Sequence, residues 1–194
     1  GANSTAASIA NTGNSTCLGG TINRTAYWVP SMIDTSTGKP IAPDSAIFYY
    51  KQGYTLNPPT IIQPLPVGLR MIAGDPTNNK AGSPVALFKC IGGPNKQNGL
   101  YGASIGNCDV GAQLIQQVFF PQCWDGVHLD SPDHKSHMAY PINGGCPATH
   151  PVPFPEVTLN FAYTVTDAAA VARWRLASDS YDSRIPAGYS LHAD

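Results

Sequence analysis

The sequence predicts a mainly β domain, a β-sandwich or jelly roll with long loops. Its 19 glycines and 18 prolines, 37 together in 194 residues, are spread along the chain and favour short strands joined by turns. Short runs of aromatic and β-branched residues recur between these turns. In one segment, Val157–Val165, large apolar residues alternate with smaller or polar ones, which are Thr158, Asn160, Ala162 and Thr164. The chain shows no repeat and no linker, so we expect a single domain over residues 1–194.

The first half of the chain contains four candidate strands. Residues 1–25 are small and polar, which is typical of a surface loop. The runs Ala26–Pro30 and Ala46–Tyr50 are predicted strands, and the turn residues of Asp34–Pro40 between them indicate a hairpin. Two further strands are expected at Leu69–Ala73 and Val85–Cys90.

The second half begins with a Gly- and Asn-rich stretch, residues 91–112, which is a predicted loop. Residues 114–119 fit a helix about as well as a strand, and Pro121 ends either one. Val157–Val165 is the strongest strand, with one buried and one solvated face. Beyond it, two alternatives remain open. Asp167 caps a short helix over residues 168–171, or Trp174 and Leu176 face inward on a strand.

Composition excludes two classes of function. Charged residues make up only 12% of the chain, the net charge is -1, and the 11 Lys and Arg form no basic run. Nucleic-acid binding therefore has no support. No apolar run is long enough to cross a bilayer, so no membrane span is expected.

The cysteines and glycosylation motifs indicate a secreted, extracellular protein. None of the five cysteines forms a CxxC pair, which favours a disulfide framework over a zinc site. We expect the bridges Cys90–Cys108 and Cys123–Cys146, each enclosing a loop without core residues. Cys17 is then left with a free thiol or a partner outside the chain. Candidate N-glycosylation sites are Asn3, Asn14 and Asn23. Gly1 follows no signal peptide, as in a mature or trimmed product, and both ends are expected to be cut.

The segment Phe119–Pro155 carries the candidate chemistry. It contains four of the five histidines together with several aspartates, and its prolines exclude a long helix. We expect a long ordered loop, pinned by the Cys123–Cys146 bridge, of the kind on which binding sites are often built. The fifth histidine, His192, lies near the carboxyl end.

Three interpretations of this segment remain open. In the first, His134 and His137 bind a divalent metal together with a carboxylate; the candidate ligands are His134, His137, Asp130, His150 and His192. In the second, side chains act as general acid and base without a metal; the candidate catalytic residues are His134, His137, Asp133 and Tyr140. In the third, the His and Asp side chains only satisfy the backbone of a Pro-rich loop.

Other polar and aromatic residues are weaker candidates. Arg70 lies in an apolar run and is interpreted as a buried ion-pair partner rather than a substrate anchor. Trp28, Trp124 and Trp174 have the rings needed to stack on sugars, but core packing is favoured for each.

Several long motifs resemble the family called domain of unknown function 1996. They are Ala26–Pro30, Gly68–Gly74, Phe120–Gly126, Leu129–Pro141 and Cys146–Pro153, and together they run through most of the chain. The resemblance implies a secreted protein of fungi or bacteria, often fused to carbohydrate-binding or cell-wall modules, with no settled activity. Members of the family carry a further His-rich segment before the equivalent of Gly1 and an aromatic stretch after the equivalent of Asp194.

Two functions are therefore expected. The first is a secreted domain that acts on or binds cell-wall or extracellular polysaccharide, as a hydrolase or lyase if it is an enzyme. The second is a non-enzymatic, wall-associated or self-assembling structural domain, in which homo-oligomers form. An enzyme would gather His134, His137, His150 and His192 around one open cleft, whereas a structural protein would bury them singly or use them at a subunit contact.

Overall fold

The computed structural model describes residues 5, 7, 8, 25–52, 56, 61–80, 83–94 and 97–194. It confirms a mainly β chain built from several antiparallel sheets in a sandwich-like arrangement. Cys17, the three candidate glycosylation sites and most of the expected surface loop 1–25 lie outside the described residues. Within the described part of the chain, no helix has the length and apolar character needed to cross a membrane.

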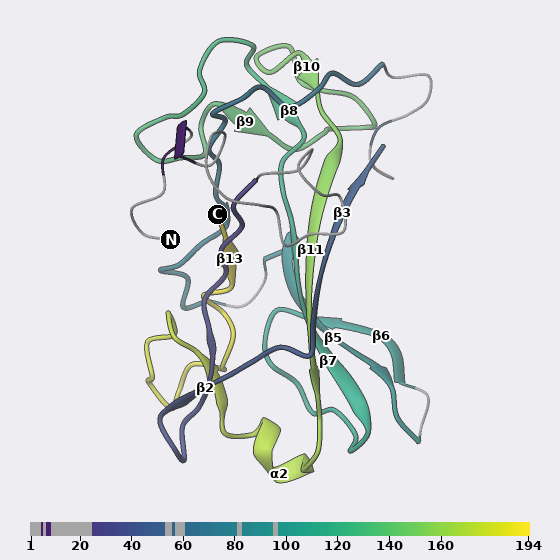
Figure 1. Cartoon of the computed structure of the whole chain (residues 1–194), viewed down its shortest axis with the longest axis vertical. Coiled ribbons are helices and arrows are strands. Elements are labelled where there is room, and N and C mark those ends of the chain that lie inside the picture. Colours follow the sequence, from purple (N-terminus) through teal and green to yellow (C-terminus); the bar gives the residue numbers. More distant parts are fainter. Residues whose placement is uncertain are drawn as a thin grey trace.

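The largest sheet has five antiparallel strands and runs along the long axis of the molecule (Figure 1). Its order across the sheet is β3 (Ser45–Lys51), β11 (Glu156–Thr164), β7 (Ala112–Phe119), β5 (Ala86–Gly92) and β6 (Gln97–Gly102). The prediction of strands near Val157–Val165, Val85–Cys90 and Ala46–Tyr50 is confirmed. The ambiguous segment 114–119 is a strand that ends before Pro121, and the expected loop 91–112 contains the unpredicted strand β6.

The core lies on one face of this sheet. In β11, Val157, Leu159 and Tyr163 are buried in it and Phe161 packs against it half-buried, as the alternation predicts. The expectation that the other face is solvated is wrong at Thr158 and Ala162, which are 1% and 5% exposed. β11 lies between β3 and β7, so both flanking strands shield this face as well.

A smaller sheet covers the core from the other side. It consists of β12 (Trp174–Leu176), β1 (Met32–Asp34) and β2 (Lys39–Ile41). Buried Trp174 and Leu176 belong to the same core cluster as the large sheet. The predicted capped helix and the predicted strand with inward Trp174 and Leu176 are both present, one after the other. Asp167 caps the short helix α2 (Ala168–Val171) by accepting from the Ala169 N–H at 2.9 Å, and β12 follows.

Two predicted strands are wrong. Residues 26–30 form no strand, and the Asp34–Pro40 turn instead joins β1 to β2, while β3 pairs with β11. Of Leu69–Ala73, only Ala73 is in a strand, β4 (Ala73–Gly74), which pairs with β13 (His192–Ala193). Segment 69–72 is fixed by single hydrogen bonds to a neighbouring loop rather than by a ladder, which a local sequence pattern does not reveal.

A third sheet and a disulfide frame the His-rich segment at one end of the molecule (Figure 1). The sheet consists of β10 (Val152–Pro153), β8 (Cys123–Trp124) and β9 (Met138–Ala139), each two residues long. The Cys123–Cys146 and Cys90–Cys108 bridges are both present, as predicted. Residues 125–137, which connect β8 to β9, are called the His/Asp loop below.

Candidate functional site

The His/Asp loop is anchored to the extended segment that precedes β4. The Arg70 N–H donates to the Leu129 carbonyl at 2.9 Å, and the Ile72 N–H donates to the His134 carbonyl at 2.8 Å. The Lys135 ammonium donates to the Gly74 carbonyl at 2.7 Å. Two segments about sixty residues apart in the sequence therefore form one surface.

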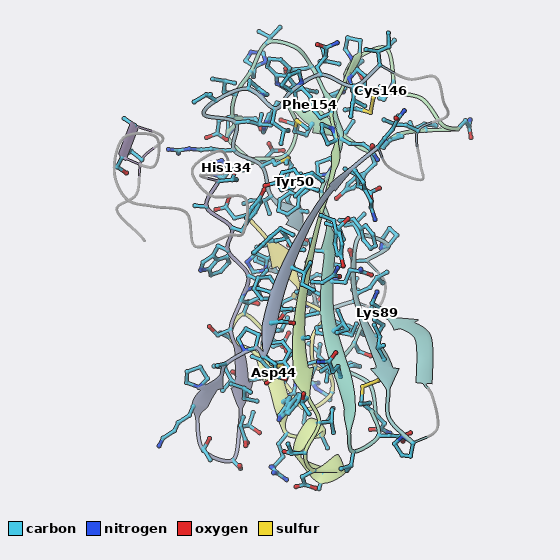
Figure 2. The ribbon with its side chains drawn as sticks, turned by 45° about the vertical axis from the view of Figure 1, so that its right-hand side comes forward. Asp44, Tyr50, Lys89, His134, Cys146 and Phe154 are labelled. Atoms are coloured by element: carbon cyan, nitrogen blue, oxygen red, sulfur yellow. A yellow bond between two sulfur atoms is a disulfide. The ribbon has the colours of Figure 1, made fainter. Side chains whose placement is uncertain are left out.

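His134 sits in a tight turn of this surface. Its N–H donates to the Ser131 carbonyl at 2.8 Å, and its backbone has φ 55°, in the left-handed region that few non-glycine residues adopt. Its Nδ1 donates to the Asp130 carboxylate at 2.6 Å. The ring is 47% exposed, and Figure 2 shows it on the outer side of the loop. The Asp130 contact fixes the tautomer and leaves Nε2 facing outward as an acceptor.

Asp130 links His134 to Arg70. The Arg70 guanidinium lies 4.0 Å from the second oxygen of Asp130 and is 59% exposed, so the predicted buried ion pair is wrong. Burial raises the pKa of Asp130, but the hydrogen bond from His134 and the charge of Arg70 outweigh it and hold the pKa below its ordinary value. The carboxylate therefore stays ionised while it orients the imidazole.

His137 differs from His134 in its exposure and in its hydrogen-bond partners, although only three residues separate them. It is 2% exposed. Its Nε2 donates to the Arg70 carbonyl at 2.7 Å, and its Nδ1 is hydrogen-bonded to the Ser131 hydroxyl at 2.8 Å. With both ring nitrogens occupied, His137 holds the loop to segment 69–72 and does not share an open depression with His134.

Asp133 also forms its hydrogen bonds within the His/Asp loop. Its Oδ1 accepts hydrogen bonds from the Ser131 hydroxyl at 2.7 Å, the Ser136 N–H at 2.9 Å and the Lys135 N–H at 3.1 Å. These bonds, the Ser136 N–H first, lower the pKa of Asp133 far below its ordinary value. Such a carboxylate is a permanent acceptor and a poor proton donor.

The remaining candidate ligands are engaged separately. His150 Nε2 donates to the Ser136 carbonyl at 3.0 Å and its Nδ1 contacts the Thr149 hydroxyl. His192 is 5% exposed and donates to the Ser190 carbonyl at 2.7 Å. Across the described ranges, no group of three or more His, Cys, Asp or Glu side chains is placed to hold a metal ion. The expected ligand set is therefore not gathered there.

The loop contains a second histidine–aspartate pair, which provides a natural comparison. His128 Nδ1 donates to Asp125 at 2.7 Å, and the imidazole is 66% exposed. Burial raises the pKa of Asp125, but the hydrogen bond from His128 and two backbone N–H groups bring it down to about 2. His128 differs from His134 in its surroundings, because within the described residues Asp125 forms no ion pair with an arginine, whereas Asp130 lies beside Arg70.

Tyr140 is held through its hydroxyl, which donates to the Phe119 carbonyl at 2.8 Å. Burial of the hydroxyl, with a smaller effect of Glu156, raises the pKa of Tyr140 far above its ordinary value. A phenol with a pKa raised in this way holds its proton, so the hydroxyl is poorly suited to the predicted role in acid–base catalysis. The ring remains 37% exposed and so offers a surface for contact instead.

A pocket of about 340 Å³ opens beside the His/Asp loop. Its polar lining comes from Asp75, Asn78, Lys135 and Tyr140, and its apolar lining includes Ile72 and Met138. Lys135 follows His134 directly, so the pocket and the His134–Asp130 pair share one stretch of chain. The sequence pattern did not indicate Asp75 and Asn78, which lie in a separate turn, and it singled out the histidines around Lys135 rather than Lys135 itself; no local pattern brings the three together.

Trp28 lies near this surface and is exposed, contrary to the prediction of core packing. It is 55% exposed, and its ring centroid lies 5.2 Å from that of His192. His192 is paired with Gly74, a residue of the pocket wall. The other two tryptophans do pack: Trp174 is 5% exposed and Trp124 stacks on Phe154.

Fold and site together define a disulfide-bonded β domain with a pocket of mixed polar and apolar lining beside the His/Asp loop. The family model described as domain of unknown function (DUF1996) matches residues 1–194, so the chain belongs to this family. No curated protein and no solved structure matches it.

Proposed function

We propose that this chain is a secreted domain that binds cell-wall or extracellular polysaccharide in the pocket beside the His/Asp loop. The pocket itself is the observation that supports this function best. Saccharide sites combine a few aromatic faces with fixed polar groups that reach hydroxyls. Here the ring of Tyr140 supplies the face, and Asp75, Asn78 and Lys135 supply charged and amide groups. The two disulfides are consistent with an extracellular protein.

The His134–Asp130 pair is the part of this site best suited to act on a bound chain. An imidazole whose Nδ1–H is held by an ionised carboxylate presents the lone pair of Nε2 in a fixed orientation, as a general base requires. A lyase would use such a base to remove the proton next to a uronate carboxylate, and a hydrolase would use it to activate water. Arg70, beside Asp130, supplies a positive charge for the carboxylate or for a developing oxyanion.

Binding is tested with a panel of insoluble and soluble polysaccharides, including cellulose, chitin, β-glucans, mannan and pectin. The wild-type chain should be retained by at least one of them. Lys135→Met removes the ammonium but keeps the stem and should weaken retention about tenfold, the effect of losing one charge-assisted hydrogen bond. Lys80→Met is the matched control, because exposed Lys80 lies near the pocket in sequence and does not line it.

Catalysis is tested separately, on whichever polysaccharide binds. His134→Asn keeps a residue that tolerates the left-handed backbone. His128→Asn removes the other exposed histidine. New reducing ends or unsaturated products that disappear in the first variant alone would support an enzyme. Retention without any product in either protein would leave a binding domain, and absence of both retention and product would reject the proposed function.

A non-enzymatic structural domain is the second candidate, and one observation favours it. His137, His150 and Asp133 all direct their polar atoms to backbone groups or hydroxyls of the loop and of the segments beside it, which is a structural use. For this candidate, His134→Asn and Lys135→Met would leave every binding measurement unchanged.

A further inference from the structure

Trp28 provides an exposed aromatic ring close to the pocket, although it is distant from the pocket residues in the sequence. Its N–H donates to the Asp194 carbonyl at 2.8 Å, and its carbonyl accepts from the Asp194 N–H at 2.9 Å. The segment that contains Trp28 therefore lies beside the chain that continues from β13. β13 in turn lies beside β4, because His192 pairs with Gly74, a residue of the pocket wall. Three neighbouring rows of backbone thus lead from Trp28 to the pocket.

The side chains of Trp28 and His192 lie on the outer face of this small ladder. Residues opposite each other in an antiparallel pair share a face, and so do residues two apart along a strand. Trp28, Asp194 and His192 therefore point to the same side, and the ring centroids of Trp28 and His192 are 5.2 Å apart. The alternate residues Ala73 and Ala193 are buried in the core. The face that carries Trp28 is thus turned away from the core.

The polar lining of the pocket lies next to the same histidine. The Lys135 ammonium donates to the carbonyl of Gly74, the partner of His192 across the ladder, at 2.7 Å. Burial is the main cause that lowers the pKa of His192, and the charges of Lys135 and Asp75 act on it in opposite directions, so both lie close to the ring. His192 therefore lies between the indole of Trp28 and the charged groups of the pocket.

Packing on His192 does not account for the whole of the Trp28 ring. The residue remains 55% exposed, although Trp174 is 5% exposed and Trp124 stacks on Phe154. An indole combines a wide apolar face with one N–H donor, which suits it to contacts that are partly wet. The exposed part of the ring therefore offers a flat apolar surface beside a polar pocket, the combination on which saccharides bind.

We propose that Trp28 forms a second saccharide subsite, on which one sugar ring stacks while another part of the same polysaccharide chain occupies the pocket. This inference rests on the proposed function and adds the class of polysaccharide. An indole packs best on a flat array of C–H groups, which hexoses with equatorial substituents present. Trp28 and Gly74 are two strand spacings apart, about 10 Å across the ladder, so a chain of several sugars is needed to reach both. The expected ligand is an extended, β-linked chain of such hexoses, as in cellulose or chitin.

Calorimetry with cellulose- and chitin-derived oligosaccharides of increasing length tests the subsite. The affinity of the wild type should rise once the oligosaccharide is long enough to reach Trp28 from the pocket. Trp28→Leu should remove this gain, with about tenfold weaker binding of the longest chain and unchanged binding of the shortest. Trp28→Tyr keeps an aromatic face and should restore most of the gain.

Tyr181→Asn is the control for loss of an exposed aromatic ring. Tyr181 is 49% exposed, lies between β12 and β13, and is not among the described residues that line the pocket. Its backbone has φ 56°, a conformation that asparagine tolerates. This variant should bind oligosaccharides of every length as the wild type does.

Quenching of tryptophan fluorescence by acrylamide gives a readout that a purely structural role would not change. Trp28 is the most exposed of the three tryptophans, so a long oligosaccharide should protect the wild type from quenching and a short one should not. The protection should be absent in Trp28→Leu.

The outcomes separate this subsite from the proposed function. Equal affinities of the wild type and Trp28→Leu for the longest oligosaccharide would overturn the subsite and leave binding in the pocket standing. The subsite would also be overturned by an equal loss at every length together with a lowered Tm, because Trp28 would then only support the fold. Weaker binding in Trp28→Leu but not in Lys135→Met would contradict a site shared with the pocket. A wild type that binds no polysaccharide would reject both proposals.

Discussion

The five-stranded sheet and the His/Asp loop are held together by different forces. In the sheet, ladders place buried apolar side chains such as Leu159 and Val118 on one face, and the stability comes from removing their surface from water. In the loop, Asp133 and His137 satisfy backbone groups directly, Ser131 bonds to both of these side chains, and the Cys123–Cys146 bridge joins the flanking segments. The first arrangement tolerates similar apolar residues, whereas the second requires particular polar atoms at particular positions.

This contrast indicates which polar residues are candidates for a binding or catalytic site. In a loop that uses most of its polar side chains on its own backbone, the informative residues are those that point elsewhere. His134 is one of them, because Asp130 holds one ring nitrogen and the other faces solvent. Lys135 is another, because its ammonium lines the pocket while it contacts the Gly74 carbonyl.

Substitution of a core residue in the five-stranded sheet should lower the free energy of unfolding most. Leu159 is fully buried in β11, so Leu159→Ala should lower the free energy of unfolding by about 2–5 kcal/mol, from lost burial and the cavity left behind. Phe161→Ala should cost less than a fully buried phenylalanine, because Phe161 is half-buried and contacts Phe48 at the sheet edge. Urea unfolding measures both. A larger loss for Phe161→Ala would show that the core is centred nearer β3.

Removal of the disulfide beside the His/Asp loop should have the second largest effect on stability. Replacing both Cys123 and Cys146 by Ser opens a closure between cysteines 23 residues apart and should cost roughly 3 kcal/mol in the chain-entropy model. The loss should appear first as protease cleavage within residues 125–145, with the large sheet still folded. If the loop and the sheet unfolded in a single transition, the two regions would not be stabilised by separate interactions.

Gly74→Ala should have an intermediate effect at the junction of the two regions. Gly74 has φ 79°, and an added Cβ would collide with the Leu191 carbonyl and approach the His192 backbone. Strain in the left-handed region alone is typically about 1–3 kcal/mol. Because Gly74 also accepts from Lys135, saccharide binding should weaken with stability. Thermal unfolding and retention on polysaccharide are the two measurements; an unaffected Tm would contradict the packing of β4 on β13.

The smallest effect is a pH dependence from His192. Burial lowers the pKa of His192 below its ordinary 6.5, and the positive charge of Lys135 acts in the same direction, opposed by Asp75, Asp194 and the Ser190 carbonyl. The folded state therefore binds this proton less readily than the unfolded state. Stability contributed by the neutral ring is complete above pH 6.5 and is lost as pH falls through the lowered pKa.

The measurement is the free energy of unfolding between pH 7 and 5 for wild type and His192→Gln. The variant should show a flatter profile in that window. The aspartates with lowered pKa values, such as Asp133, lose their contribution only as pH falls below their ordinary value of 3.8, so the two effects are separable. Identical slopes for the two proteins would refute the assignment to His192.

The sequence predicted the regions in which local pattern and tertiary structure agree. The alternation of Val157–Val165 reflects one buried face, and the spacing of the cysteines around loops without core residues identified both bridges. Ala26–Pro30 failed because aromatic residues there pack individually: Tyr27 stacks on Phe48, and Trp28 pairs its backbone with Asp194 at the far end of the chain.

The candidate site was predicted only in part. The composition of residues 125–137 indicated a rigid polar loop, but it did not distinguish exposed His134 from buried His137. That distinction depends on the Arg70 carbonyl, which accepts from His137 across the fold. The pocket was not predictable, because Asp75, Asn78 and Lys135 meet only through the pairing of β4 with β13 and the anchoring of the loop.

His134 and His137, three residues apart, differ in role: His137 stabilises the fold, whereas His134 is proposed to act on the bound polysaccharide. Thermal unfolding with and without the retained polysaccharide tests this difference in one measurement, since a ligand of the folded state raises Tm. His137→Ala should lower the Tm of the free protein, because the Arg70 carbonyl loses its bond from His137 and the Ser131 hydroxyl keeps only its bond to Asp133. The shift caused by polysaccharide should remain. His134→Asn should keep the Tm of the free protein and reduce the shift. Equal losses of Tm and of shift in both variants would contradict the account.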